Sequence, residues 1–92
     1  MTDAAFAVRV ACDSMAPMFL TGDIVYCAAA DAVPDGSIAA VLIDGMCALK
    51  RVYHAARGFI LECEDSTFPP IHVTPPELEI IGRPVGLQRS FA

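Results

Sequence analysis

Positively charged side chains are scarce in this chain. Its 92 residues include six Lys and Arg against eleven Asp and Glu, which gives a formal net charge of −5. Nucleic-acid binding draws most of its affinity from Lys and Arg that neutralise phosphates. The five arginines and the single lysine are also scattered along the sequence. We therefore expect no direct contact between these residues and nucleic acid.

The residue patterns of a metal site are missing too. None of the four cysteines forms a C-x-x-C pair, and there are only two histidines. Zinc sites need such ligands at short, regular spacing, so we expect no metal and no other cofactor. Free cysteine behaves as a small buried hydrophobe in reducing compartments. Four buried or half-buried thiols are therefore expected, at Cys12, Cys27, Cys47 and Cys63.

Long apolar runs are absent. The longest aliphatic stretch, IAAVLI at 38–43, is too short to cross a bilayer. The first residues, MTDAAFAVRV, begin with an acidic residue and lack the apolar core of a signal peptide. These absences predict a cytoplasmic protein that does not contact a membrane.

The composition is that of a folded chain, with 55% hydrophobic and 18% charged residues. The length predicts one domain, residues 1–92. A domain this small buries a modest share of its surface, so an apolar patch that pairs two copies would help to stabilise it. A homodimer is therefore expected.

Turn residues interrupt the sequence often, and long helical periodicity is missing. The alternation of apolar and polar residues predicts a mainly β domain with little helix. Asp44-Gly45 predicts a tight hairpin, and residues 54–58 predict another turn. Gly82 and Pro84 predict a bulge or bend in the last strand. About seven short strands are expected, at 5–11, 24–28, 37–43, 46–53, 59–63, 71–73 and 77–89.

Ser14 occupies a position suited to a nucleophile. The first predicted strand leads directly to it, and a short turn, MAPMF, follows. Backbone N–H groups in such a turn can hold an oxyanion. A serine needs a base beside it, however. His54 and His72 are available, but both are expected to be exposed turn or edge residues.

Lys50 is the alternative base, as in Ser-Lys variants of the catalytic triad. In a strand over 46–53 it would share a face with Met46, Ala48 and Val52. Burial favours the neutral amine, the form that accepts a proton. The alternative is a lysine whose stem lies on apolar surface while its amine reaches water. Spacing alone leaves both interpretations open.

Several motifs together resemble the carboxy-terminal domain of LexA-type and phage repressors. These proteins are self-cleaving serine peptidases related to signal peptidases, with a small β-barrel fold. The resemblance covers about four fifths of the chain, in the family's order. The matching pieces are D-S-M-A-P at 13–17, G-D-I-V at 22–25, A-L-K-R-V at 48–52, E-D-S-T-F-P-P-I at 64–71 and I-I-G-R-P-V-G at 80–86.

The resemblance implies roles for individual residues. Ser14 would be the nucleophile and Lys50 the general base, with the backbone N–H groups of Asp13 and Ser14 holding the oxyanion. Other residues would shape the site: Met15 and Pro17 in the turn that presents the serine, and Gly22 and Asp23 in the turn that follows.

The chain departs from the family pattern in two places. The family has a glycine close before its D-S-M motif, where Cys12 stands here. Its members cut themselves at an Ala-Gly or Cys-Gly bond upstream of the serine, and neither dipeptide occurs in this chain. The bond to be cleaved is therefore not part of this sequence.

The resemblance implies an autoproteolytic domain that dimerises a transcriptional repressor. In LexA proteins a recombinase filament triggers the cut and relieves repression in the SOS response. A non-enzymatic dimerisation module of the same fold and a processed SOS mutagenesis protein that partners a translesion polymerase remain alternatives. Whether the chain is a fragment of a longer repressor or a stand-alone protein also stays open.

Overall fold

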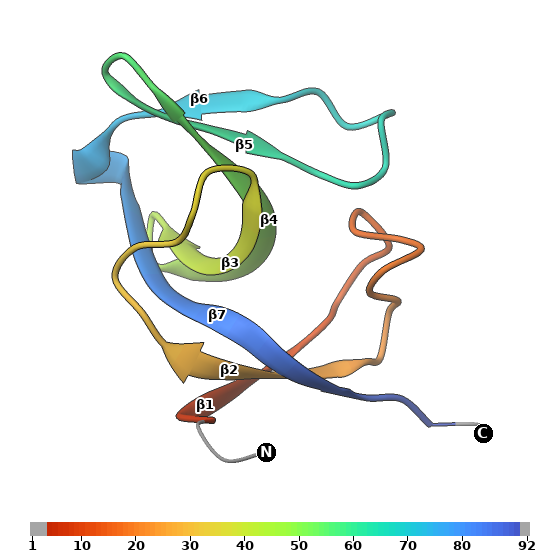
Figure 1. Ribbon diagram of the computed structural model, residues 1–92. Coiled ribbons are helices and arrows are strands. Elements are labelled where there is room, and N and C mark those ends of the chain that lie inside the picture. Colours follow the sequence, from red (N-terminus) through yellow and green to blue (C-terminus); the bar gives the residue numbers. More distant parts are fainter. Residues whose placement is uncertain (1–3, 91–92) are drawn as a thin grey trace.

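The computed structural model describes residues 4–90 and is mainly β (Figure 1). Seven antiparallel strands form one sheet in the order β1-β2-β7-β3-β4-β5-β6. The prediction of a mainly β domain with about seven strands is thus confirmed. The elements are β1 (Phe6–Arg9), β2 (Ile24–Ala29), β3 (Ser37–Ile43), β4 (Met46–Ala55), β5 (Gly58–Glu62), β6 (Ile71–Val73), the short 3-10 helix η1 (Pro75–Glu77) and β7 (Leu78–Gln88).

The strand β7 lies between β2 and β3 although it is the last strand in the chain. Its pairing with β2 skips Val85, and its pairing with β3 skips Ile81. These irregularities flank Gly82 and Pro84, where the sequence predicts a bulge or bend. Bulges bend a strand and increase its twist. The bent β7 runs across the sheet in Figure 1 and connects β1 and β2 with the curled β3–β4 hairpin.

The hairpin between β3 and β4 is the one that Asp44-Gly45 predicts. Ile43 pairs with Met46 across a two-residue turn, and the φ angles of Asp44 and Gly45 are 51° and 80°. Positive φ at both central residues is what the tightest hairpin turns require. The next turn is shorter than predicted, because β4 continues to Ala55 and β5 begins at residue 58.

Two groups of buried side chains lie on opposite faces of β4. Leu49 belongs to the first group and Val52 to the second, which agrees with the alternation of side chains along a strand. By this alternation Lys50 leaves the strand on the side of Val52, but its amine reaches Cys63, which packs against the first group. The first group also contains Val10, Met15, Phe19, Val25, Cys27 and Ala40, and the second contains Val33, Ala39, Val41, Leu61, Val73 and Leu78.

Within residues 4–90 the helical structure is limited to η1. Accordingly, this part of the chain has no helix with the length and apolar character that crossing a membrane would require.

Candidate active site

The turn that follows β1 presents Ser14. Hydrogen bonds from Ala16 N to the Asp13 carbonyl and from Phe19 N to the Met15 carbonyl, both 3.0 Å, close this turn. The Asp13 carboxylate accepts hydrogen bonds from Thr21 N at 3.0 Å and Thr21 Oγ1 at 2.8 Å. These bonds also lower the pKa of the Asp13 carboxyl. The predicted short turn at 15–19 is therefore present, and its two ends are held together.

The Gly22-Asp23 turn leads into β2 and anchors this segment. Gly22 has a φ of 93°, and its N–H donates to the Val10 carbonyl at 2.8 Å. The Asp23 side chain is buried, and its carboxylate accepts bonds from Arg89 at 2.8 and 2.6 Å and from Leu20 N at 2.7 Å. The Arg89 guanidinium, followed by the Leu20 N–H, lowers the pKa of Asp23 to about 2.

Ser14 and Lys50 line the same cavity of about 130 Å³. Ser14 is buried, with 6% of its surface exposed, and Lys50 is half-buried. Met15 and Phe19, both in the first buried group, provide apolar walls. Among the site-shaping residues expected from the sequence, Met15 reaches this cavity, whereas Pro17 is exposed and follows a cis peptide bond.

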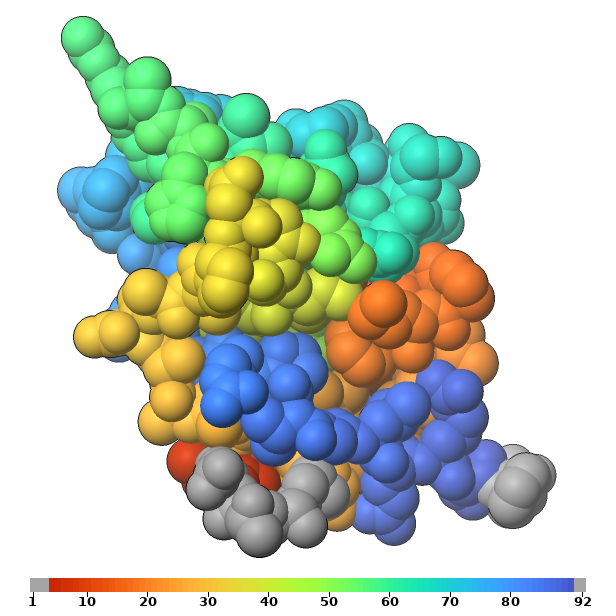
Figure 2. All heavy atoms as spheres, in the orientation of Figure 1, coloured from red at the N-terminus to blue at the C-terminus, as the bar shows by residue number. Residues whose placement is uncertain are grey.

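The serine hydroxyl and the lysine amine each contact a thiol. Ser14 Oγ lies 3.3 Å from Cys12 Sγ, and Lys50 Nζ donates to Cys63 Sγ at 3.0 Å. A bond from Asp65 N to the Ser14 carbonyl, 3.0 Å, joins the β5–β6 loop to the serine turn. Figure 2 shows the turn packed between this loop and the C-terminal end of β7.

The cysteines are less buried than the sequence indicated. Cys27 is buried and Cys63 half-buried, but Cys12 and Cys47 are exposed, and all four are free thiols. The expectation fails for Cys12 because it lies in the turn beyond β1, and for Cys47 because it lies close to the turn of the β3–β4 hairpin. Both exposed thiols line the cavity of Ser14 and Lys50.

The thiols of Cys12 and Cys47 differ in their electrostatic surroundings. The hydrogen bond with the Ser14 hydroxyl lowers the pKa of Cys12, with further contributions from the Ser14 backbone N–H and the charge of Lys50. Partial burial of the thiol raises the pKa of Cys47. Of these two, Cys12 is the one whose environment favours the thiolate.

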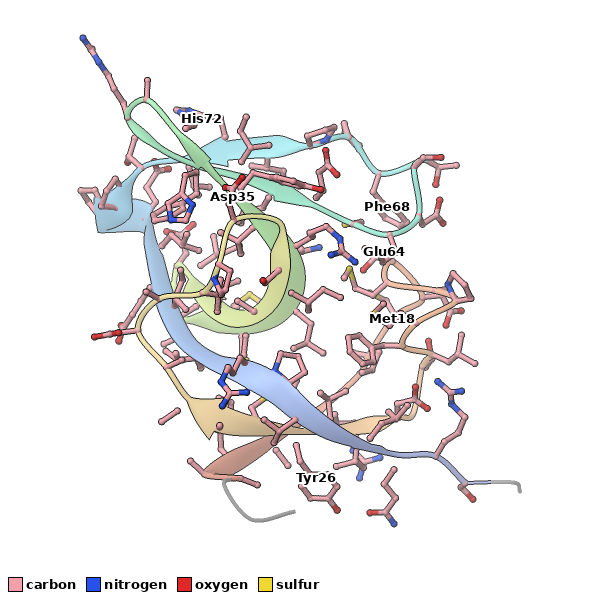
Figure 3. All side chains as sticks on the ribbon, viewed as in Figure 1. Met18, Tyr26, Asp35, Glu64, Phe68 and His72 are labelled. Atoms are coloured by element: carbon pink, nitrogen blue, oxygen red, sulfur yellow. The ribbon has the colours of Figure 1, made fainter. Side chains whose placement is uncertain are left out.

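Neither histidine reaches the cavity. Both are exposed, as expected, and His54 Nδ1 lies 3.0 Å from Asp35 Oδ1. Figure 3 shows Asp35 and His72 well away from Met18, which belongs to the serine turn. Among the described residues, the basic side chains that line the cavity with Ser14 are Arg9 and Lys50. Within residues 4–90 there is also no group of three or more His, Cys, Asp and Glu side chains that could hold a metal ion.

Three side-chain contacts that support the site were not predicted from the sequence. They are Arg89 on Asp23, Cys12 on Ser14 and Cys63 on Lys50. Two of them join segments that are far apart in the chain, so no local pattern indicates them. The Cys12 contact could have been suspected, because a thiol replaces the family's glycine two residues before the serine.

Comparison with known proteins identifies the family. The Peptidase S24-like family model matches residues 1–85, and the chain belongs to this family. Curated relatives include LexA repressors from Thermosipho africanus, 36% identical over 94% of this chain, from Desulforamulus reducens, 35% over 94%, and from Deinococcus radiodurans, 33% over 88%. The chain spans only 44%, 40% and 40% of the lengths of these relatives. The resemblance to LexA-type peptidase domains is thus confirmed.

Proposed function

We propose that this chain is a serine endopeptidase domain of the self-cleaving LexA type, with a Ser14–Lys50 dyad. The observation that carries the proposal is the shared cavity, which both side chains line. The membership of the S24-like family supports it as well.

In the proposed reaction Ser14 Oγ attacks the carbonyl carbon of the scissile peptide bond. The neutral Lys50 amine takes the hydroxyl proton and then delivers it to the leaving amine. The backbone N–H groups of Asp13 and Ser14 stabilise the oxyanion. Water, deprotonated by the same lysine, releases the acyl group and regenerates the serine.

The described contacts set one requirement for this reaction. Lys50 Nζ donates to Cys63, and Ser14 Oγ contacts Cys12. Both contacts must therefore break before Ser14 Oγ and Lys50 Nζ can form a hydrogen bond with each other. Catalytic hydrogen bonds often form fully only when substrate is bound. Substrate that enters the apolar cavity would have to bring about this exchange of partners.

The proposal extends to the whole protein. Relatives of more than twice this length are named LexA repressors, so we propose that the domain is the dimerising part of a cytoplasmic transcriptional repressor in the SOS response. A recombinase filament would trigger its cleavage.

Dimerisation is supported by large apolar side chains on the surface: Met18, Leu20, Met46, Phe68, Ile71 and Leu87. Light scattering that detects only monomers at high protein concentration would contradict the dimer.

The test of the dyad supplies a peptide with an Ala-Gly or Cys-Gly bond in trans. Wild-type protein should cleave it, faster at mildly alkaline pH, whereas Ser14→Ala and Lys50→Met should not. Ser66→Ala serves as a matched control, because Ser66 is exposed in the β5–β6 loop. Cleavage that survives Ser14→Ala would overturn the dyad.

One observation favours a second candidate, a dimerisation module without peptidase activity. The thiol of Cys12, at a position where the family has a glycine, forms a hydrogen bond with the hydroxyl of Ser14. The Cys12→Gly variant separates the two candidates. Dimeric protein that cleaves no peptide with either cysteine or glycine at this position would favour the module.

A further inference from the structure

Two thiols approach the two proposed catalytic groups from different segments of the chain. Cys12, in the turn after β1, contacts Ser14 Oγ at 3.3 Å, and Cys63, just after β5, accepts from Lys50 Nζ at 3.0 Å. The bond from Asp65 N to the Ser14 carbonyl holds these segments together. Ser14 and Lys50 therefore each have a cysteine sulfur as a hydrogen-bond partner.

Cys12 is the accessible member of this pair. It is exposed and lines the cavity, whereas Cys63 is half-buried and does not line it. Small reagents that enter the cavity consequently meet the Cys12 sulfur beside the serine hydroxyl. The Ser14 hydroxyl and backbone N–H stabilise negative charge on this sulfur, as the lowered pKa of Cys12 reflects. The thiolate, rather than the thiol, is the nucleophilic form of cysteine.

We propose that Cys12 is a modification site at which a peroxide forms a sulfenic acid and thereby blocks Ser14. The sulfur attacks one oxygen of the peroxide, so an S–O bond forms and the O–O bond breaks. The sulfur loses two electrons, the peroxide gains them, and the second oxygen leaves as hydroxide and takes up a proton to give water. A thiol reductant reverses the modification.

The expected consequence follows from the position of the sulfur. The added oxygen extends Cys12 further into a cavity of about 130 Å³. There it competes with the substrate carbonyl for the Ser14 N–H, which the proposed mechanism needs for the oxyanion. The loss of activity rests on the proposed function, whereas the formation of the sulfenic acid does not.

Cys47 provides an internal control for the chemical part of the proposal. It is exposed and lines the same cavity, but partial burial raises the pKa of its thiol. Accessibility alone would make the two cysteines react alike. Stabilisation of the Cys12 thiolate by Ser14 would make them differ.

The first experiment treats the protein with hydrogen peroxide and dimedone, which traps sulfenic acids, and quantifies each cysteine by peptide mass spectrometry. We expect dimedone on Cys12 to form about tenfold faster than on Cys47. The Ser14→Ala variant should slow the labelling of Cys12 and leave Cys47 unchanged, with circular dichroism to verify that it folds. Equal labelling of the two cysteines, or labelling of Cys12 that does not depend on Ser14, would overturn the proposal.

The second experiment measures peptide cleavage before and after peroxide. Wild-type protein should lose its activity and recover it with dithiothreitol, whereas the Cys12→Gly variant should keep its own untreated rate. Inactivation of the glycine variant to the same extent would overturn the regulatory part. If untreated protein cleaves nothing, the proposed peptidase function fails, and the dimedone experiment still decides whether Cys12 is the modification site.

Discussion

Arg89 binds both carboxylate oxygens of Asp23, a residue 66 positions earlier in the chain. The distances are 2.8 Å from Nε to Oδ1 and 2.6 Å from Nη2 to Oδ2. Such a two-point contact is stronger and more directional than a single ion pair. It ties the end of β7 to the turn that carries Ser14, and Leu20 N, in that turn, donates to the same carboxylate.

This contact predicts a characteristic dependence of stability on pH. The Asp23 carboxyl has a pKa of about 2 in the folded protein, below its ordinary value of 3.8. Its stabilising contribution is therefore complete above the ordinary pKa and is lost as the pH falls through about 2. Arg89→Met should lower the free energy of unfolding at pH 6, and the difference from wild type should shrink between pH 4 and pH 2.

Urea denaturation at several pH values measures this effect. Arg83→Met is a matched control, because Arg83 is an exposed arginine in β7, the strand that ends just before Arg89. A difference between wild type and Arg89→Met that stays constant down to pH 2 would show that Asp23 is not the group responsible.

Gly82, in β7, is predicted to be a glycine that alanine replaces only at a large cost in stability. A Cβ at this position would lie 2.6 Å from Phe6 Cζ and 2.7 Å from the carbonyl oxygen of Ala28. Overpacking of this kind costs about 1–3 kcal/mol, and here one neighbour is backbone and cannot rotate away. Gly82→Ala should destabilise the protein at the upper end of this range.

Gly45→Ala is the comparison for Gly82→Ala in chemical denaturation. Gly45 has a φ of 80°, but no atom lies within 4 Å of the position that an added Cβ would take. Its substitution therefore costs only backbone strain of about 1–2 kcal/mol. A larger loss for Gly45→Ala than for Gly82→Ala would refute the packing argument.

Arg51 is predicted to support the loop that contacts the serine turn. Its Nε and Nη2 both donate to Glu64 Oε1 at 2.7 Å, and its Nη1 donates to the Gly36 carbonyl at 2.6 Å. Both side chains are partly exposed, with 26% and 23% of their surfaces accessible, so the ion pair is screened by solvent. Arg51→Lys cannot make all three contacts and should lower stability by about 0.5–1 kcal/mol.

Thermal unfolding at low and high salt tests this prediction. The exposed Arg57, in the β4–β5 turn, offers the control substitution Arg57→Lys, which should be neutral. An equal effect of the two substitutions would mean that the Arg51 contacts contribute nothing in solution.

Much of the fold follows from short-range patterns in the sequence. Alternating apolar residues and the Asp44-Gly45 turn act within a few residues, so strands and hairpin can be predicted from them. The turn at 54–58 is wrong in length because His54 and Ala55 carry no strong strand or turn preference, and pairing with β5 extends the strand through them. The position of β7 in the middle of the sheet depends on long-range pairing.

In the candidate site, too, some residues could be predicted from local motifs and others could not. Ser14 and Lys50 could be singled out because each stands in a recognisable motif, and the structure brings both to one cavity. Arg89 could not be singled out from the sequence. A lone arginine near the end of a strand has no pattern that indicates a buried carboxylate as its partner. Likewise, exposure of Cys12 and Cys47 depends on where the turns fold, which composition does not determine.

Leu61 tests the second buried group independently of the site. Its side chain is 1% exposed and packs with the residues on the Val52 face of the sheet. Leu61→Ala should destabilise the protein by about 2–5 kcal/mol, since it leaves a cavity. Leu87→Ala, at a position with 43% exposure, should have a small effect in the same denaturation experiment. Similar losses at both positions would show that burial does not govern their contributions.

The central place of β7 has a consequence for the growing chain on the ribosome. β2 and β3 are made early, but each needs β7 as its neighbour, and residues 78–88 are synthesised after all the other strands. Until they leave the exit tunnel, the segment with Ser14 and the segment with Lys50 have no common strand to align them. The sheet is therefore completed only when β7 is available, so that a nascent chain that lacks β7 does not yet bring Ser14 and Lys50 to one cavity.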